Sequence, residues 1–91
     1  MAKKSQPRYP DSVKALKAVA ARFKALRIEK GYTNYENFAF KNDLNRSQVW
    51  RYENGEDLKI SSLLKMLNAL DVSLDEFFNE KLEKDLKEGH G

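Results

Sequence analysis

Two arginines, a serine and a tryptophan recur at the spacing of one helix face near the middle of the chain. Arg46, Ser47, Trp50 and Arg51 stand at positions i, i+1, i+4 and i+5, which share one side of an α-helix. Guanidinium groups donate paired hydrogen bonds to guanine O6 and N7 or to phosphate. A helix that displays this set therefore points to nucleic-acid binding.

The helix that must carry these side chains has clear ends. Asn45 is a good N-cap, and Asn54-Gly55 supplies a stop at which a positive φ is cheap. Val49 and Tyr52, together with the preceding Leu44, fall on the inner side. We expect a short, displayed helix from residue 46 to residue 53 or 54.

The polar residues of this helix also have plainer roles. Each bidentate arginine–guanine contact discriminates by ~1–3 kcal/mol, so Arg46 and Arg51 could read sequence, but they could also bind only phosphate or solvent. Arg51 could instead pair with Glu53 or another acid. Trp50 could contact a sugar or a thymine methyl, fill a dimer interface, or cover the core.

Composition narrows the class of protein. The 91 residues suffice for one small domain. Without cysteine, and with one histidine at His90, the chain offers little for catalysis, so we expect no enzyme activity, no metal and no cofactor. It has neither an apolar run of membrane-spanning length nor a secretory h-region, and we expect a cytoplasmic protein.

The charge is distributed unevenly along the chain. Residues 1–31 carry nine Lys or Arg and two Asp or Glu, residues 32–55 carry three of each, and residues 56–91 carry five against nine. A basic front and an acidic back would orient the molecule toward a polyanion, although lysines also simply solvate helices.

The N-terminal third is expected to form an arm and a long helix. Residues 1–10 have no periodicity and are predicted to be a basic, disordered arm. Apolar residues at helical spacing then predict a helix from 11 or 12 to 30, stopped by Gly31. Its opposite side would carry Lys14, Lys17, Lys24 and Arg27.

Two short helices follow, joined by a tight turn. Thr33 or Asn34 can begin a helix over residues 35 to 41 or 42, with Phe38 and Ala39 facing inward. Asn42-Asp43 forms the turn before the helix at 46. Two short helices joined in this way define a helix-turn-helix.

The C-terminal part is predicted to contain two more helices. The first covers about residues 61–70, and the second, capped by Ser73 with Glu76, could continue through Leu82 and Leu86. Those two leucines could form a dimer contact or pack on their own domain. The aromatic residues expected in the core or covering it are Tyr9, Phe23, Tyr32, Phe38, Phe40, Phe77 and Phe78.

Residues 19–78 resemble the phage repressor and Cro-like helix-turn-helix family, the xenobiotic-response-element type of regulator. The matching pieces are V-A-A-R-F-K-A-L-R-I-E-K-G, F-A, N-R-S-Q-V-W-R-Y-E-N-G and S-L-L-K-M-L-N-A-L-D-V-S-L-D-E-F-F. The resemblance implies an all-α, compact five-helix lambda-repressor-like DNA-binding domain, with the helix-turn-helix at helices 2 and 3. We expect it over residues 11–80, followed by a helical extension and frayed tail over 81–91.

The resemblance also implies roles for single residues. Base contacts would fall to Arg46, Ser47, Gln48 and Arg51, and Arg27 would form a structural ion pair with Glu53. The sequence departs from the family where Asp43 replaces the usual turn glycine. The expected contacts to the DNA backbone are Tyr35, Asn45, Trp50, Asn54 and Lys59.

Two functions from different classes remain. The first is a sequence-specific regulator of double-stranded DNA, a repressor in type, acting as a homodimer for which Leu82 and Leu86 are one candidate contact. The second is a protein-interaction module or antitoxin on the same fold, with a toxin or other protein as partner and DNA binding secondary.

Overall fold

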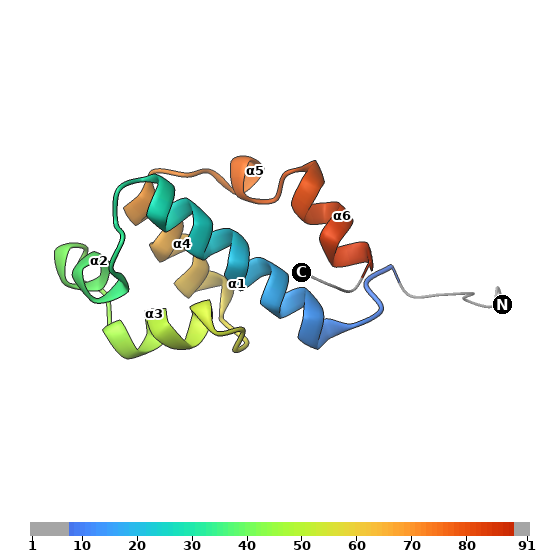
Figure 1. Ribbon diagram of the computed structural model, residues 1–91, viewed down its shortest axis with the longest axis horizontal. Coiled ribbons are helices and arrows are strands. Elements are labelled where there is room, and N and C mark those ends of the chain that lie inside the picture. The colour runs from blue at the N-terminus through green and yellow to red at the C-terminus, as the bar shows by residue number, and fades with distance from the viewer. Residues whose placement is uncertain (1–7, 89–91) are drawn as a thin grey trace, which may run out of the picture.

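A computed structural model describes residues 8–88, and within them the chain forms six helices and no strand. Predictions for the arm at 1–7 and for the tail with His90 lie outside the described residues. Figure 1 shows α1 crossing the middle of the molecule, with α6 above its N-terminal half and α3 below it. The helices are α1 (Ser12–Glu29), α2 (Tyr35–Lys41), α3 (Arg46–Glu53), α4 (Ile60–Leu70), α5 (Leu74–Phe77) and α6 (Glu80–Glu88).

The first helices begin and end at residues suited to those positions. The Asp11 carboxylate accepts from the Lys14 amide at 3.1 Å and caps α1. At the other end Gly31 takes φ +99°, so that the Gly31 and Tyr32 amides bond back to carbonyls of α1. Asn34 caps α2 through the Asn37 amide at 3.0 Å, which selects it over Thr33.

One core joins the helices. The largest fully buried side chains come from α1, α2, α3, α4 and α5, so each of these helices contributes to the same interior. The Phe23 and Phe38 rings meet edge to face at 5.8 Å, and Tyr32 meets Phe38 at 5.0 Å. These five buried side chains are Phe23, Phe38, Val49, Leu67 and Phe77.

The last helix, which could have continued through Leu82 and Leu86, is interrupted, because the chain breaks between α5 and α6. Arg22 on α1 donates to the Glu76 and Phe77 carbonyls at 2.7 and 3.2 Å, so these carbonyls already have partners outside the helix. Asn79 then starts α6 by accepting from the Leu82 amide at 2.9 Å. The hydrogen bonds at the break thus come from Arg22, which lies 55 positions before Phe77 in the sequence.

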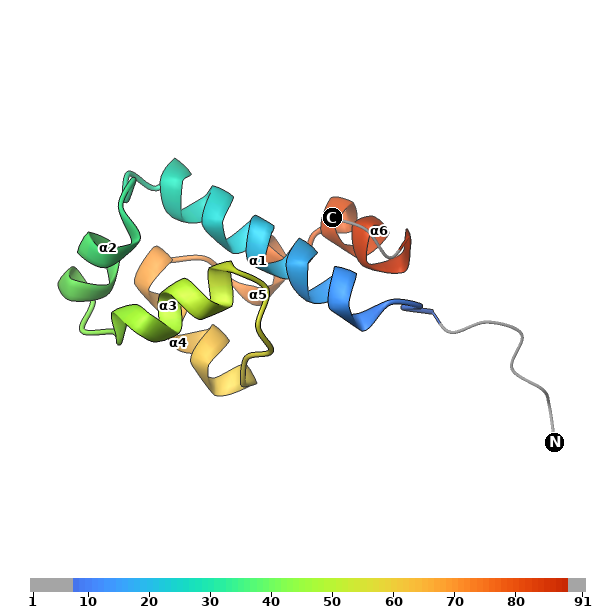
Figure 2. The same cartoon turned by 60° about the horizontal axis from the view of Figure 1, so that its bottom comes forward.

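The break turns α6 back onto α1, which Figure 2 shows from a second side. Leu82 is only 3% exposed and belongs to the core, and Leu86 packs against it. Of the two roles predicted for these leucines, the structure shows packing on their own domain. Leu82 is therefore not available as a dimer contact in this arrangement.

Two further expectations fail on exposure. Phe40 is 84% exposed, because it lies on the outer side of α2 while Phe38 and Ala39 fill the inner side. Tyr9 is also exposed, whereas the Phe78 ring, 40% exposed, meets the buried Phe77 ring edge to face at 4.9 Å and covers the core as expected. Arg27, expected among the surface cations of α1, is buried.

No helix within residues 8–88 has the length and apolarity needed to cross a membrane.

Candidate nucleic-acid interface

Local backbone contacts fix both ends of α3. The Asn45 Oδ1 accepts from the Gln48 amide at 3.0 Å, as an N-cap should. At the other end Gly55 takes φ +89°, and the Gly55 and Glu56 amides bond to the Tyr52 and Arg51 carbonyls. The predicted bounds of this helix are therefore confirmed.

The turn between α2 and α3 closes without glycine. Asp43 takes φ +55°, the conformation for which glycine would be the easiest residue. The Leu44 amide bonds to the Ala39 carbonyl at 2.8 Å, and the Asn42 side-chain amide donates to the Phe38 carbonyl at 2.9 Å. Asn42 thus adds a side-chain hydrogen bond at the end of α2, next to Asp43, where the sequence departs from the family.

The two faces of α3 separate as predicted. Val49 and Tyr52 are buried against the core. Arg46, Ser47, Trp50 and Arg51 are all exposed on the other side. These four side chains line one hollow of about 480 Å³, here called the arginine hollow, together with Tyr35, Glu36 and Glu56.

Each arginine of the arginine hollow faces a glutamate. Arg46 Nη1 lies 2.8 Å from Glu36 Oε2, and Arg51 Nε lies 3.0 Å from Glu56 Oε1. The alternative that Arg51 pairs with an acid is therefore realised, with Glu56 as its partner. Glu53 instead faces α1.

Gln48 and Asn45 lie on the other flank of α3. Both line a second hollow of about 140 Å³ that also includes Ser62 and Lys65 of α4. The predicted base-contacting residues are thus divided, with Arg46, Ser47 and Arg51 in one hollow and Gln48 in the other.

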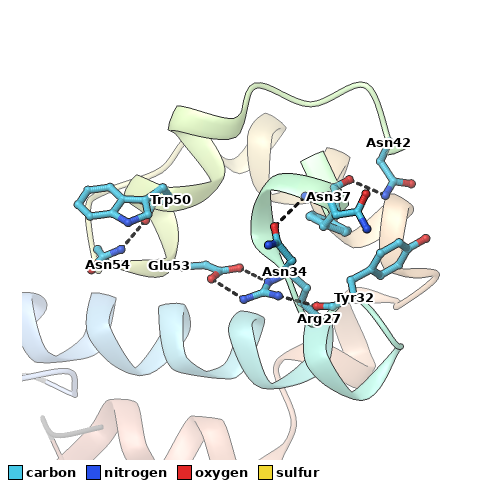
Figure 3. A network of polar contacts seen from close by, with 9 residues as sticks. Arg27, Tyr32, Asn34, Asn37, Asn42, Trp50, Glu53 and Asn54 are labelled. Atoms are coloured by element: carbon cyan, nitrogen blue, oxygen red, sulfur yellow. Dashed lines mark hydrogen bonds and ion pairs between the residues drawn. The ribbon is translucent and has the colours of Figure 1, made fainter. Parts of the chain in front are cut away.

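Trp50 does not cover the core. Its side chain is about half exposed, and it lines the arginine hollow with Tyr35. Its carbonyl accepts from the Asn54 side-chain amide at 2.7 Å, which keeps Asn54 beside it at the end of α3 (Figure 3). An indole is therefore available at the surface beside two arginines.

A buried ion pair holds α3 to α1. Arg27 Nε lies 2.6 Å from Glu53 Oε2, and Arg27 Nη2 lies 3.0 Å from Glu53 Oε1. The third nitrogen of this guanidinium donates to the Tyr32 carbonyl, as Figure 3 shows. The pair expected between Arg27 and Glu53 is present, and it fixes the C-terminal end of α3.

Two lysines near α3 were not among the predicted site residues. Lys65 reaches the second hollow from α4, and Lys17 of α1 packs beneath Gly55 in the loop after α3. Only the tertiary fold brings them there, and no local sequence signal distinguishes them from other surface lysines. The predicted Lys59 is exposed at the start of α4.

Acidic side chains do not gather into a metal site here. Within the described residues no group of three or more His, Cys, Asp or Glu could hold a metal ion.

This geometry defines the helix-turn-helix class of fold. A family model described as helix-turn-helix matches residues 23–77. The wild-type restriction-modification controller protein C.Esp1396I is 36% identical, with a TM-score of 0.66 over 78% of this chain and 91% of that one. The structure of a point mutant of C.Esp1396I is likewise 36% identical, with a TM-score of 0.68 over 79% of this chain and 95% of that one. No curated protein matches the chain.

The chain therefore belongs to the helix-turn-helix family, in its Cro and lambda-repressor-like branch, and is a DNA-binding regulator. The six helices retain the arrangement predicted for that fold, with the last predicted helix divided in two.

Proposed function

We propose that the protein reads double-stranded DNA with α3 in the major groove. The observation that carries this proposal is the exposure of Arg46, Ser47 and Arg51 together on a helix capped at both ends. An α-helix with its side chains is about 10–12 Å across and the major groove is about 12 Å wide, so α3 fits into the groove.

We assign base contacts to Arg46, Ser47 and Arg51 from the arginine hollow and to Gln48 from the opposite flank. Contacts to the DNA backbone fall to residues on α3, at its ends, and on the segments beside it. Lys17 and Lys65 join them as phosphate contacts because of their positions in the fold. The proposed backbone contacts are Tyr35, Asn45, Trp50, Asn54, Lys59, Lys17 and Lys65.

We further propose that two copies bind a pseudo-palindromic operator as a homodimer, with half-sites ~34 Å apart. Since Leu82 is buried, the contact must use other side chains. Exposed apolar side chains on α4, on α5 and at the C-terminal end of α5 support a contact there rather than on α6. They are Ile60, Leu64, Leu74 and Phe78.

The regulatory role we propose is repression, in which the bound protein blocks access of RNA polymerase to the DNA. We further propose that the protein acts in the cytoplasm and that it binds DNA without catalysing a reaction. The similarity to a restriction-modification controller protein makes control of such a system the first role to test. A toxin or other protein partner is the competing role.

The test is selection of duplexes from a random pool by the purified full chain, with the mass of the complex measured alongside. We expect one enriched sequence with two related halves, bound by two chains. Binding that ignores sequence at physiological salt would contradict the proposal. Recovery of a stoichiometric protein from extract, without DNA affinity, would favour the competing role.

A further inference from the structure

We propose that Glu36 and Glu56 are specificity-determining residues, which hold Arg46 and Arg51 in position for guanine and disfavour their contact with phosphate. This inference rests on the proposed reading of DNA by α3. A surface that faces the negatively charged DNA backbone is expected to carry a positive charge. The charged side chains of the arginine hollow are two arginines and two glutamates, so its formal charge is zero.

Each of the two ion pairs uses one guanidinium nitrogen and leaves the other two without a partner among residues 8–88. Arg46 uses Nη1 on Glu36, and its Nε and Nη2 have no protein partner among residues 8–88. Arg51 donates from Nε to Glu56, and its Nη1 and Nη2 have no protein partner among residues 8–88. Guanine O6 and N7 need two donors, so each arginine can bind a guanine edge and keep its glutamate.

Arg27 shows the contrasting arrangement. All three of its nitrogens have protein partners, and its side chain is buried. Arg27 is therefore a structural arginine, whereas the exposed side chains of Arg46 and Arg51 each retain two nitrogens without a partner among residues 8–88.

A phosphate in the arginine hollow would meet a different surface. It carries a full charge, so an arginine that binds it brings that charge close to the neighbouring carboxylate. A guanine edge is uncharged and has no such penalty. The glutamates therefore oppose phosphate binding in any sequence, and they restrict two long side chains to orientations that suit a base edge.

The experiment compares the full chain with Glu36→Gln and Glu56→Gln on two duplexes, the best sequence from the selection and a random one. Glutamine keeps the size of the side chain and removes its charge. We expect each variant to bind random duplex roughly two- to fivefold more tightly, the range of an exposed ion pair. Affinity for the selected duplex should stay level or fall, so the specificity ratio falls. If an arginine gains a phosphate, the salt slope on random duplex should steepen by about one.

Glu80→Gln is the matched control, because it makes the same charge change on α6, away from the arginine hollow. It should leave the ratio unchanged. Combining Glu36→Gln with Arg46→Ala shows whether the glutamate acts through its arginine, since the effect of Glu36→Gln should then disappear.

Equal shifts on both duplexes, or none, would overturn the inference. The inference would also be overturned if the ratio of affinities for the selected and random duplexes stayed unchanged and Glu80→Gln changed both affinities by the same factor. That result would mean that only the net charge of the protein matters. A wild-type chain without any sequence preference would instead refute the proposed function, and the two failures are therefore distinguishable.

Discussion

The guanidinium of Arg27 and the carboxylate of Glu53 form a two-point ion pair whose side chains are 3% and 6% exposed. The pair joins α1 to the last turn of α3, one turn or less from Trp50 and Arg51. The angle at which α3 presents its outer face therefore depends on a contact inside the protein.

Glu53→Gln should lower the free energy of unfolding by about 3 kcal/mol or more, because it leaves the Arg27 charge buried without its counter-ion. Urea unfolding measures the loss. The matched control is Glu56→Gln, whose exposed pair with Arg51 contributes at most ~1 kcal/mol. Similar losses of unfolding free energy in Glu53→Gln and Glu56→Gln would mean that burial of the ion pair does not determine how much it stabilises the protein.

Gly55→Ala should be destabilising for two separable reasons. Its φ of +89° disfavours any Cβ by ~1–2 kcal/mol, and the added Cβ would lie 3.0 Å from Lys17 Cγ. Gly31 has φ +99° and nothing within 4 Å of an added Cβ, so Gly31→Ala should show the first effect alone.

Thermal unfolding of the two alanine variants measures the difference, with Gly55→Ala the less stable. In a Lys17→Ala background the excess loss should vanish, since the Cγ is absent. An excess that persists there would contradict a clash with Lys17.

The capping box at the start of α5 should make stability depend on acid pH. Bonds from the Ser73 backbone amide and hydroxyl to the Glu76 carboxylate hold its pKa below the ordinary value of 4.5. Because the pKa of Glu76 is lower in the folded protein than in the unfolded chain, its carboxylate stabilises the fold at any pH above the unfolded-state pKa. This contribution is lost as the pH falls through the folded-state pKa.

Glu76→Gln keeps the size and hydrogen bonding of the box without the charge. Wild type should be the more stable at about pH 7, and the difference should close in the acid range below the ordinary carboxyl pKa. Carbon-detected NMR of the Glu76 carboxyl gives the pKa directly. A value at or above the ordinary one would contradict the prediction.

Local signals in the sequence were sufficient for most of the fold. The N-caps at Asn45 and Ser73, the positive-φ stop at Gly55 and the apolar spacing of α1 act within one or two turns, so the sequence displays them directly. The shared outer face of Arg46, Ser47, Trp50 and Arg51 follows from helix periodicity alone.

The rest depended on contacts between distant segments. The break after Phe77 involves Arg22, and the burial of Leu82 depends on α6 folding back onto α1. The partners of Arg46 and Arg51 lie on α2 and in the loop after α3, which helix spacing cannot specify. Phe40 was expected in the core or covering it, but its neighbours already fill the inner side of α2, and its side chain is exposed.

Repeating the duplex selection with Arg46→Ala, Arg51→Ala and Lys59→Ala tests the central claim that α3 reads sequence. We predict that each arginine variant loses its preference at one or more base pairs and binds the wild-type sequence more weakly by ~1–3 kcal/mol. Lys59→Ala should keep the preferred sequence and lower only the affinity and the salt slope, the latter by about one. An unchanged preferred sequence in both arginine variants would contradict the claim.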